Sequence, residues 1–209
     1  MNKKKAIFVI GLPGSGKSTL SSRLTDENTD IISSGILISK LSNPNQKYYI
    51  DNYVNLGIDI PDNIYCNWII SFINQSNKRK FIIEGFPSNY KQVIIAKKMF
   101  ESSNVSLEKV LYLNISKENA MIRLLNRRVC QICNISFSNS ILKCTNCGRK
   151  TTIRQDDNFK IATNRLINYS KSLNEVKKYY YDKNLLIEIN ANESSEKKNK
   201  KLIKQIKRL

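Results

Sequence analysis

The sequence predicts an α/β fold in which a mostly parallel sheet of about five strands is covered by helices on both faces. Two observations carry this prediction. Short apolar runs typical of buried strands alternate with segments of helical periodicity along the 209 residues. The first apolar run, residues 5–10, leads directly into the glycine-rich segment 11–19 and then into a helix. The length suits one domain with small insertions.

The elements follow in order along the chain. The expected strands cover residues 5–10, 30–32, 80–84, 110–115 and 185–189. The expected helices cover residues 18–25, 34–41 and 47–54, a segment that opens at Pro61, and residues 91–100, 117–128 and 157–181. We expect Asn43-Pro44-Asn45 to separate two short helices. A final helix is expected after residue 193, with Leu202, Ile203 and Ile206 on one face.

Composition excludes several classes of chemistry. The chain has no histidine, which rules out a Ser-His-Asp triad, a Cys-His nucleophile pair and a His-ligated metal. The net charge of +18 favours anionic partners, but ten of the positive charges lie at residues 3–5 and 197–208. We interpret these basic ends mainly as solvated surface and expect no nucleic-acid partner. No apolar run approaches the roughly 20 residues of a membrane span, so we expect a cytoplasmic protein with no membrane partner.

A phosphate-binding loop follows the first expected strand. The segment Gly11-x4-Gly16-Lys17-Ser18 matches the Walker A pattern in its strand–loop–helix context. The glycines let backbone N–H groups turn toward phosphate oxygens, Lys17 reaches the β and γ phosphates, and the Ser18 hydroxyl faces Mg²⁺ directly or through water. A P-loop NTPase-type three-layer fold that binds ATP with Mg²⁺ is therefore predicted. The ATP-binding residues expected here are Gly14, Ser15, Gly16, Lys17, Ser18 and Thr19.

Four of the five cysteines form two close pairs. Cys130-x2-Cys133 and Cys144-x2-Cys147 have the spacing of a zinc ribbon, in which four thiolates bind tetrahedral Zn²⁺. Such a zinc would be structural, because all four positions are filled and none is left for a substrate. Disulfides or unligated thiols are the alternatives. Cys66, on an apolar helix, is interpreted as a core residue.

The chain from residue 6 to about residue 189 resembles the adenylate kinase family of nucleoside monophosphate kinases, in the form that has a zinc-binding lid. The resemblance rests on the joint order of GLPGSGKST at 11–19, ISSG at 32–35, GIDIPD at 57–62, EGFPSNYKQ at 84–92, RLLNRRVCQIC at 123–133, CTNCG at 144–148, RQDD at 154–157 and NRL at 164–166. It implies a core domain formed by residues 1–32, 63–127 and 157–209. It also implies an acceptor-binding insertion at 33–62 and a zinc-ribbon lid at 128–156. We expect a monomer.

The resemblance also implies an activity and a site. The activity is reversible transfer of the ATP γ-phosphoryl to a nucleoside monophosphate, with AMP as the favoured acceptor and two ADP as products. Beside the loop, ATP contacts are implied for Arg123, Arg127, Ser136 and Phe137. Catalytic roles are implied for Lys17, Arg127, Arg154, Arg165, Asp156 and Asp157. Acceptor contacts are implied for Ser34, Gly35, Ile58, Asp59, Ile60, Gly85, Phe86, Pro87, Gln92, Arg154 and Arg165. Arg123 and Arg127 are expected to share a face of one helix.

Two departures weaken the match on the acceptor side. Ser39 and Ser88 stand where the family usually has arginines that clamp the acceptor phosphate, and serine does not replace a bidentate arginine fork. Three explanations stay open: Lys40 and Lys91 supply the missing charge, the acceptor is another small phosphorylated or hydroxylated molecule, or ATP binds with little transfer. A zinc-ribbon nucleic-acid-binding protein is the alternative from another class.

Overall fold

The computed structural model describes residues 3–133, 135–154, 157–192 and 206. Its strands are β1 (Lys4–Gly11), β2 (Thr29–Ile32), β3 (Lys80–Glu84), β4 (Val105–Asn114), β5 (Arg127–Val129), β6 (Ser136–Ser138), β7 (Thr152–Ile153) and β8 (Leu186–Asn190). Its α-helices are α1 (Lys17–Leu24), α2 (Ser34–Ser39), α3 (Asn43–Tyr49), α4 (Asp62–Gln75), α5 (Tyr90–Ser102), α6 (Lys117–Leu125) and α7 (Phe159–Asp182). A π-helix, η1 (Ile50–Val54), continues α3.

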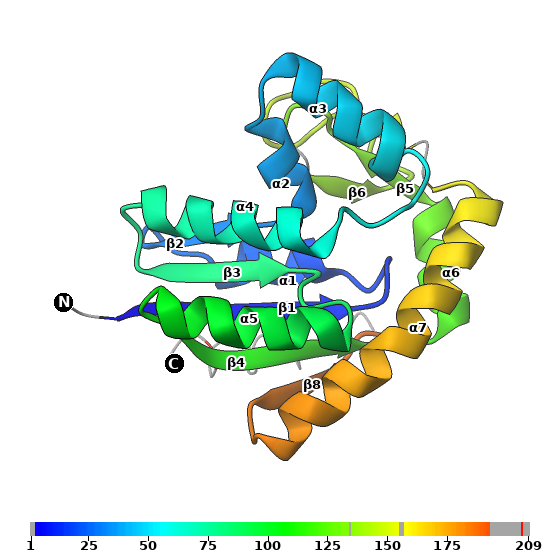
Figure 1. The fold of residues 1–209 in the computed structure, drawn as a ribbon. Coiled ribbons are helices and arrows are strands. Elements are labelled where there is room, and N and C mark those ends of the chain that lie inside the picture. Colours follow the sequence, from blue (N-terminus) through cyan, green and yellow to red (C-terminus); the bar gives the residue numbers. More distant parts are fainter. Residues whose placement is uncertain (1–2, 134, 155–156, 193–205, 207–209) are drawn as a thin grey trace.

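The main sheet is parallel and runs in the order β2-β3-β1-β4-β8 (Figure 1). On β1, Phe8 packs into one hydrophobic cluster while its neighbour Val9 packs into a second one. On β3, Ile83 and Ile82 divide between the same two clusters. Successive side chains of a strand point to opposite faces, so both faces of this sheet are buried. The predicted parallel five-stranded sheet is confirmed.

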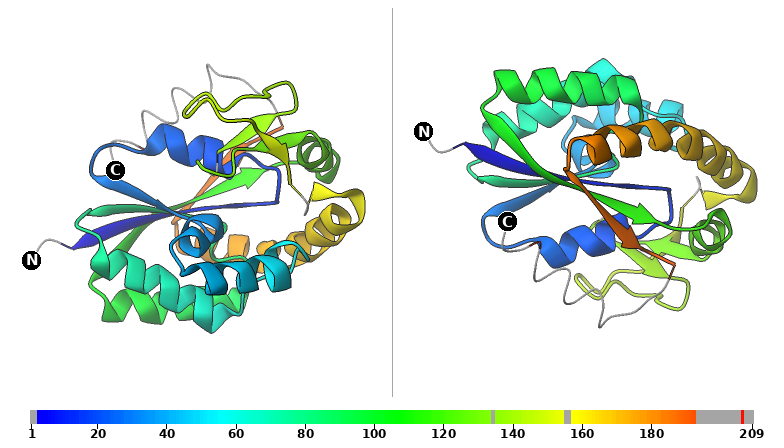
Figure 2. Two further views of the ribbon diagram at one scale, coloured as in Figure 1. Left: turned by 90° about the horizontal axis from the view of Figure 1, so that it is seen from above. Right: turned by 90° about the horizontal axis from the view of Figure 1, so that it is seen from below.

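Helices complete a three-layer arrangement. Figure 2 shows α4, α5 and α7 on one face of the sheet and α1 on the other. Leu24 of α1 and Ile206 pack into the cluster on the α1 face. The helix predicted after residue 193 lies outside the described residues except for Ile206, which is helical and buried. No described helix has the length and apolar character needed to cross a membrane.

Three predicted boundaries are wrong. Strand β4 begins at Val105 instead of residue 110. The Asn43-Pro44-Asn45 segment begins α3 instead of separating helices, because proline fits the first helical turn. Helix α6 ends at Leu125 instead of residue 128, and Asn126 caps it with a side-chain hydrogen bond to the Ile122 carbonyl at 2.9 Å. Arg127 begins β5, which pairs with β6 and β7 in a small antiparallel sheet. Arg123 and Arg127 therefore do not share a helix face, because strand pairing replaces the last helical turn.

The two predicted insertions lie on one side of the main sheet. Figure 1 shows α2 and α3 on the same side of the main sheet as β5 and β6. The loops at the carboxyl ends of β1, β2 and β3 carry Pro13, Gly14, Gly16, Ser33 and Gly85, which all face this region. Ligands of open parallel α/β sheets bind at the carboxyl ends of the strands. The fold therefore places the phosphate loop and both insertions around one site.

Candidate active site

A cavity of about 570 Å³ lies among the phosphate loop, the α2 segment, the lid strands and α7. Most of the sequence-predicted site residues line it. They are Gly14, Gly16, Lys17, Ser18, Thr19, Ser34, Gly35, Ile58, Asp59, Ile60, Gly85, Gln92, Arg123, Arg127, Ser136, Phe137, Arg154 and Arg165. Residues that are distant in sequence and were assigned to ATP, acceptor and catalysis thus meet around a single space.

A few predicted site residues lie outside this lining. Phe86 is fully buried, because its ring packs edge-on against Phe8 and Tyr65 at centroid distances of 5.5 and 5.9 Å. Pro87 is also buried outside the cavity wall. Ser15 is buried within the loop, and its hydroxyl has no hydrogen-bond partner among the described residues. Asp156 lies outside the described residues, so its predicted role stays a prediction.

The phosphate loop holds Lys17 against its own backbone. Gly14 has a φ of +81°, and a Cβ there would lie 2.6 Å from the Ala120 carbonyl oxygen, so the close approach of loop and α6 requires glycine. The Lys17 ammonium donates to the carbonyl oxygens of Gly11 and Leu12, both at 3.0 Å. Burial lowers the pKa of Lys17 to about 8; Glu84 opposes the shift, while Arg165 and Arg127 add to it. An anionic phosphate bound at the loop would stabilise the charged form of Lys17 and raise its pKa again.

Oxygen donors suited to Mg²⁺ lie next to the loop. The Ser18 hydroxyl donates to Glu84 Oε2 at 2.8 Å, and Glu84 ends β3 with little exposed surface. Hydroxyl and carboxylate oxygens are hard ligands of the kind that Mg²⁺ takes, usually together with water and substrate phosphates. This donor set fits a Mg²⁺ ion bound with ATP.

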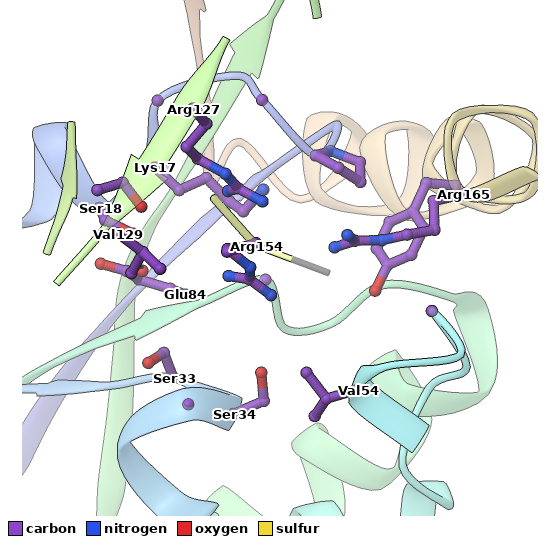
Figure 3. Close-up of a pocket in the computed structure, with 18 of the residues that line it drawn as sticks. Lys17, Ser18, Ser33, Ser34, Val54, Glu84, Arg127, Val129, Arg154 and Arg165 are labelled. Atoms are coloured by element: carbon purple, nitrogen blue, oxygen red, sulfur yellow. Dashed lines mark hydrogen bonds between the residues drawn. The ribbon is translucent and has the colours of Figure 1, made fainter. Parts of the chain in front are cut away.

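A buried carboxylate orders two arginines at the opposite side of the loop. Arg127 donates through Nε and Nη2 to the two oxygens of Asp157 at 2.7 and 2.6 Å, a bidentate pair. Arg165 Nη1 lies 3.8 Å from Asp157 Oδ1. Figure 3 shows Lys17, Arg127, Arg154 and Arg165 directed into the same open space. Converging cations of this kind stabilise the charge of a transferring phosphoryl group.

One end of the cavity suits a flat heterocycle. The Arg123 guanidinium is fixed by a hydrogen bond from Nη2 to the Ala191 carbonyl oxygen at 2.8 Å. The exposed side chain of Ile122 and the ring of Phe137 line the cavity with it. Planar guanidinium groups and apolar surfaces stack on bases. Ile122 was not predicted, because at this point of the chain the resemblance begins at its neighbour Arg123.

The acceptor-side wall combines hydroxyl groups with apolar side chains. We define it as the lining residues Ser33, Ser34, Gly35, Val54, Gly57, Ile58, Asp59, Ile60, Tyr65, Ser88 and Gln92. None of these described residues is a lysine or an arginine. Figure 3 shows Ser33, Ser34 and Val54 across the open space from Lys17 and Arg127. Ser33, Val54 and Tyr65 are members of this wall that the sequence analysis missed. Ser33 stands inside the ISSG segment, where only Ser34 and Gly35 were assigned a role, and Val54 and Tyr65 belong to no motif.

The expected substitute cations do not line this wall. The Lys40 ammonium lies 4.3 Å from the centroid of the Phe72 ring, and Lys91 is exposed on α5. Neither belongs to the described lining of the cavity. The explanation in which these lysines replace the missing arginines therefore finds no support in this conformation.

Gln92 is held in one orientation. Its Oε1 accepts from the Ser88 backbone N–H at 2.7 Å and from the Ser88 hydroxyl at 3.2 Å, and its Nε2 donates to Asp62 Oδ1 at 2.7 Å. A backbone N–H only donates and a carboxylate only accepts, so these partners fix which amide atom is which. One Nε2 hydrogen remains for a ligand.

The four lid cysteines form a compact sulfur cluster. Their Sγ atoms all lie within 4.8 Å of one another, and Cys130 Sγ is 3.5 Å from Cys147 Sγ. No disulfide joins them. Zn–S bonds of about 2.3 Å in a tetrahedron place sulfurs about 3.8 Å apart, so the cluster fits Zn²⁺. The Cys133 backbone N–H donates to Cys130 Sγ at 3.4 Å, and Asn146 Nδ2 donates to Cys133 Sγ at 3.3 Å, as outer partners of a metal site do.

Comparison with known proteins agrees with this geometry. The family model described as adenylate kinase matches residues 9–185. An adenylate kinase from Chlamydia caviae is 31% identical over 189 residues, which cover 87% of this chain and 88% of the relative. An adenylate kinase from Pyrococcus abyssi is 30% identical over 198 residues, with 90% and 89% covered. One from Mesomycoplasma hyopneumoniae is 28% identical over 206 residues, with 94% and 95% covered. The chain therefore belongs to the adenylate kinase family and is a nucleoside monophosphate kinase.

Proposed function

We propose that the chain transfers the γ-phosphoryl group of ATP to AMP and so forms two ADP. The observation that carries the proposal is the convergence of Lys17, Arg127, Arg154 and Arg165 on one cavity between the phosphate loop and the acceptor-side wall. Phosphoryl transfer depends on positioning and charge stabilisation and needs little acid–base chemistry. A chain without histidine is therefore equipped for it.

ATP would occupy the loop end of the cavity. The backbone N–H groups of residues 14–19 cradle its phosphates, and Lys17 leaves the loop carbonyls for the β and γ phosphates. Arg123 and Phe137 hold the adenine, with Ile122 beside them. Ser18 and Glu84 hold Mg²⁺ directly or through water, and the ion supplies neutralisation of phosphate charge.

AMP would occupy the acceptor-side wall. Val54, Ile58 and Ile60 offer an apolar surface to the base, and the remaining Nε2 hydrogen of Gln92 offers a donor to the base edge. Arg154 and Arg165 are the cations left to bind the acceptor phosphate. The choice of AMP among the nucleoside monophosphates is supported by the names of the relatives, all of which are adenylate kinases.

The lid would close over the reacting groups. We assign residues 128–156 to the lid, 33–62 to the acceptor insertion, and 1–32, 63–127 and 157–209 to the core. The lid sheet begins at Arg127, the last core residue, and carries Phe137 into the cavity wall, so closure excludes water beside this positive charge. A structural Zn²⁺ on the four cysteines would stiffen this small sheet.

An acceptor panel tests the proposal. ADP formation is measured by a coupled assay with ATP and Mg²⁺ and with AMP, CMP, UMP or GMP, and Lys17→Met serves as the inactive control. We expect AMP to exceed the other acceptors at least about tenfold in kcat/KM, because a base-specific hydrogen bond and apolar fit are worth that much. A preference for another nucleotide would overturn the AMP assignment. ATP binding without turnover on any acceptor would favour an ATP-binding relative with little transfer.

A further inference from the structure

The segment 57–60 of the acceptor insertion docks along one face of α7. Gly57 has a φ of +66°, and a Cβ there would lie 2.5 Å from Ile161 Cγ2 and 3.1 Å from Arg165 Cδ. Asp59 Oδ1 accepts a hydrogen bond from the Tyr169 hydroxyl at 2.6 Å. Ile161, Arg165 and Tyr169 follow each other at intervals of four, so they share one helix face. The contact places the Arg165 stem between Gly57 and the Asp59–Tyr169 hydrogen bond.

Arg165 packs against the acceptor insertion, whereas the side chain of Arg127 is paired with the Asp157 carboxylate. Arg127 is fixed by two short bonds to Asp157, whereas Arg165 Nη1 lies 3.8 Å from the same carboxylate. Figure 3 shows the Arg165 guanidinium extending from α7 into the open space that Arg154 also faces. Packing of Gly57 against Cδ and Cγ of Arg165 restricts the side chain near its charged end.

The acceptor insertion supplies no cation of its own to the acceptor-side wall within the described residues. The insertion can therefore place a positive charge beside the acceptor phosphate only through its contact with Arg165 of α7. Burial and the nearby Asp59 carboxylate raise the pKa of Tyr169 well above its ordinary value, while Arg165 opposes the shift. The hydroxyl stays protonated throughout the neutral range and remains a donor to Asp59.

We propose that Asp59 and Tyr169 are positioning residues: their hydrogen bond latches segment 57–60 onto α7 and aims Arg165 at the acceptor phosphate. Docking of the acceptor insertion and delivery of positive charge to the acceptor are then one event. This inference rests on the proposed function, because it assumes an acceptor phosphate beside Arg165.

Kinetics of three variants tests the latch. Tyr169→Phe and Asp59→Ala each remove the hydrogen bond, so we expect kcat/KM for AMP to fall about fivefold or more while KM for ATP changes less than about twofold. Asp59→Asn keeps an amide oxygen that accepts from Tyr169 and should recover most of the loss. Tyr181→Phe, at the exposed end of the same helix, is the matched control and should behave as wild type.

A double-mutant comparison shows whether Tyr169 acts through Arg165. In an Arg165→Lys background, Tyr169→Phe should cost less than about twofold, because the group it positions is already altered. An equal loss in both backgrounds, or a Tyr169→Phe enzyme indistinguishable from wild type, would overturn the latch.

Hydrogen exchange separates this failure from failure of the proposed function. Wild type without ADP formation would refute the proposed function alone. The latch is then read from the amides of Gly57 and Ile58, which donate to Val54 and Tyr53 at 3.1 and 2.9 Å. These amides should exchange faster in Tyr169→Phe than in wild type and Tyr181→Phe, with the amides of β1 unchanged. Equal exchange in all three proteins would contradict the latch.

Discussion

At the scale of single residues, Lys17 shows how the fold prepares a charge for its ligand. Its ammonium lies on two loop carbonyls, in a site where burial, opposed by Glu84 and reinforced by two arginines, lowers its pKa to about 8. The free protein therefore holds a lysine that is only partly charged above pH 8. A bound phosphate adds negative charge and raises this pKa again.

Proton uptake on ATP binding follows from this shift. At pH 8.5 a group with a pKa of about 8 is about three-quarters neutral, so ATP binding should take up most of one proton. Affinity should fall as the pH rises through about 8. Titration calorimetry in two buffers of different ionisation enthalpy measures the uptake. Lys17→Arg, which stays charged, is the control and should show none. Buffer-independent heats in wild type would refute the shift.

Asp157 has a different role, since it organises cations without lining the cavity. Asp157→Ala leaves Arg127 and Arg165 without their shared carboxylate. We expect a loss of about 1–3 kcal/mol in unfolding free energy, because both guanidinium groups keep some access to water, and at least about tenfold in kcat. Urea unfolding and steady-state rates measure the two effects.

Glu101→Gln is the matched control for Asp157→Ala. The Lys97–Glu101 pair is exposed and 4.0 Å long, so its removal should cost less than about 0.5 kcal/mol and leave the rate unchanged. Equal stability and rates for Asp157→Ala and Glu101→Gln would contradict the organising role of Asp157.

Most residues within motifs were predictable, and residues between motifs were not. The spacing of the Walker A segment around Lys17 is typical of a phosphate-binding loop, and the spacing of the four cysteines is typical of a zinc site. Both groups were therefore predicted from the sequence. Val54, at the end of η1, and Tyr65, in the first turn of α4, line the cavity only because the tertiary fold brings these two elements to it. Tyr169 carried a usable signal that was missed: it stands four residues after Arg165 on a predicted helix.

At the scale of elements, helix and strand interiors were predicted better than their ends. The sequence placed α6 correctly but extended it to residue 128, because nothing local distinguishes a further stretch of helix from a strand. The pairing of β5 with β6 and β7 is decided by residues that lie up to 25 positions away, as Arg128 with Ile153 illustrates. The error changed the site, since Arg127 lines the cavity from the start of β5 and not from helix α6.

The lid should depend on zinc. Purified protein should contain about one zinc per chain, and Cys144→Ser should lose it together with several degrees of thermal stability, because the small sheet has few other contacts. Cys66→Ala is the control: it removes a buried thiol of α4 and should keep the zinc. Elemental analysis by mass spectrometry makes the comparison. Far less than one zinc in wild type would refute the metal site.

At the scale of the whole molecule, the order of strands and helices was enough to predict the fold without any single motif. Alternating strands and helices require a parallel sheet, and a sheet of this kind brings its loops to one edge. That argument located the site, but it could not show which way Lys40 points or that segment 57–60 contacts α7. Both features depend on packing between insertions and core, for which the sequence has no periodic signal.

Transfer itself is the central claim, and label transfer measures it most directly. ATP labelled in its γ-phosphoryl group is mixed with AMP, Mg²⁺ and the purified chain, and the products are separated over time. Direct transfer predicts that the label appears in the β-phosphoryl group of ADP made from AMP, and that Lys17→Met abolishes this. Label that appears only in inorganic phosphate, or that stays in ATP, would contradict the account.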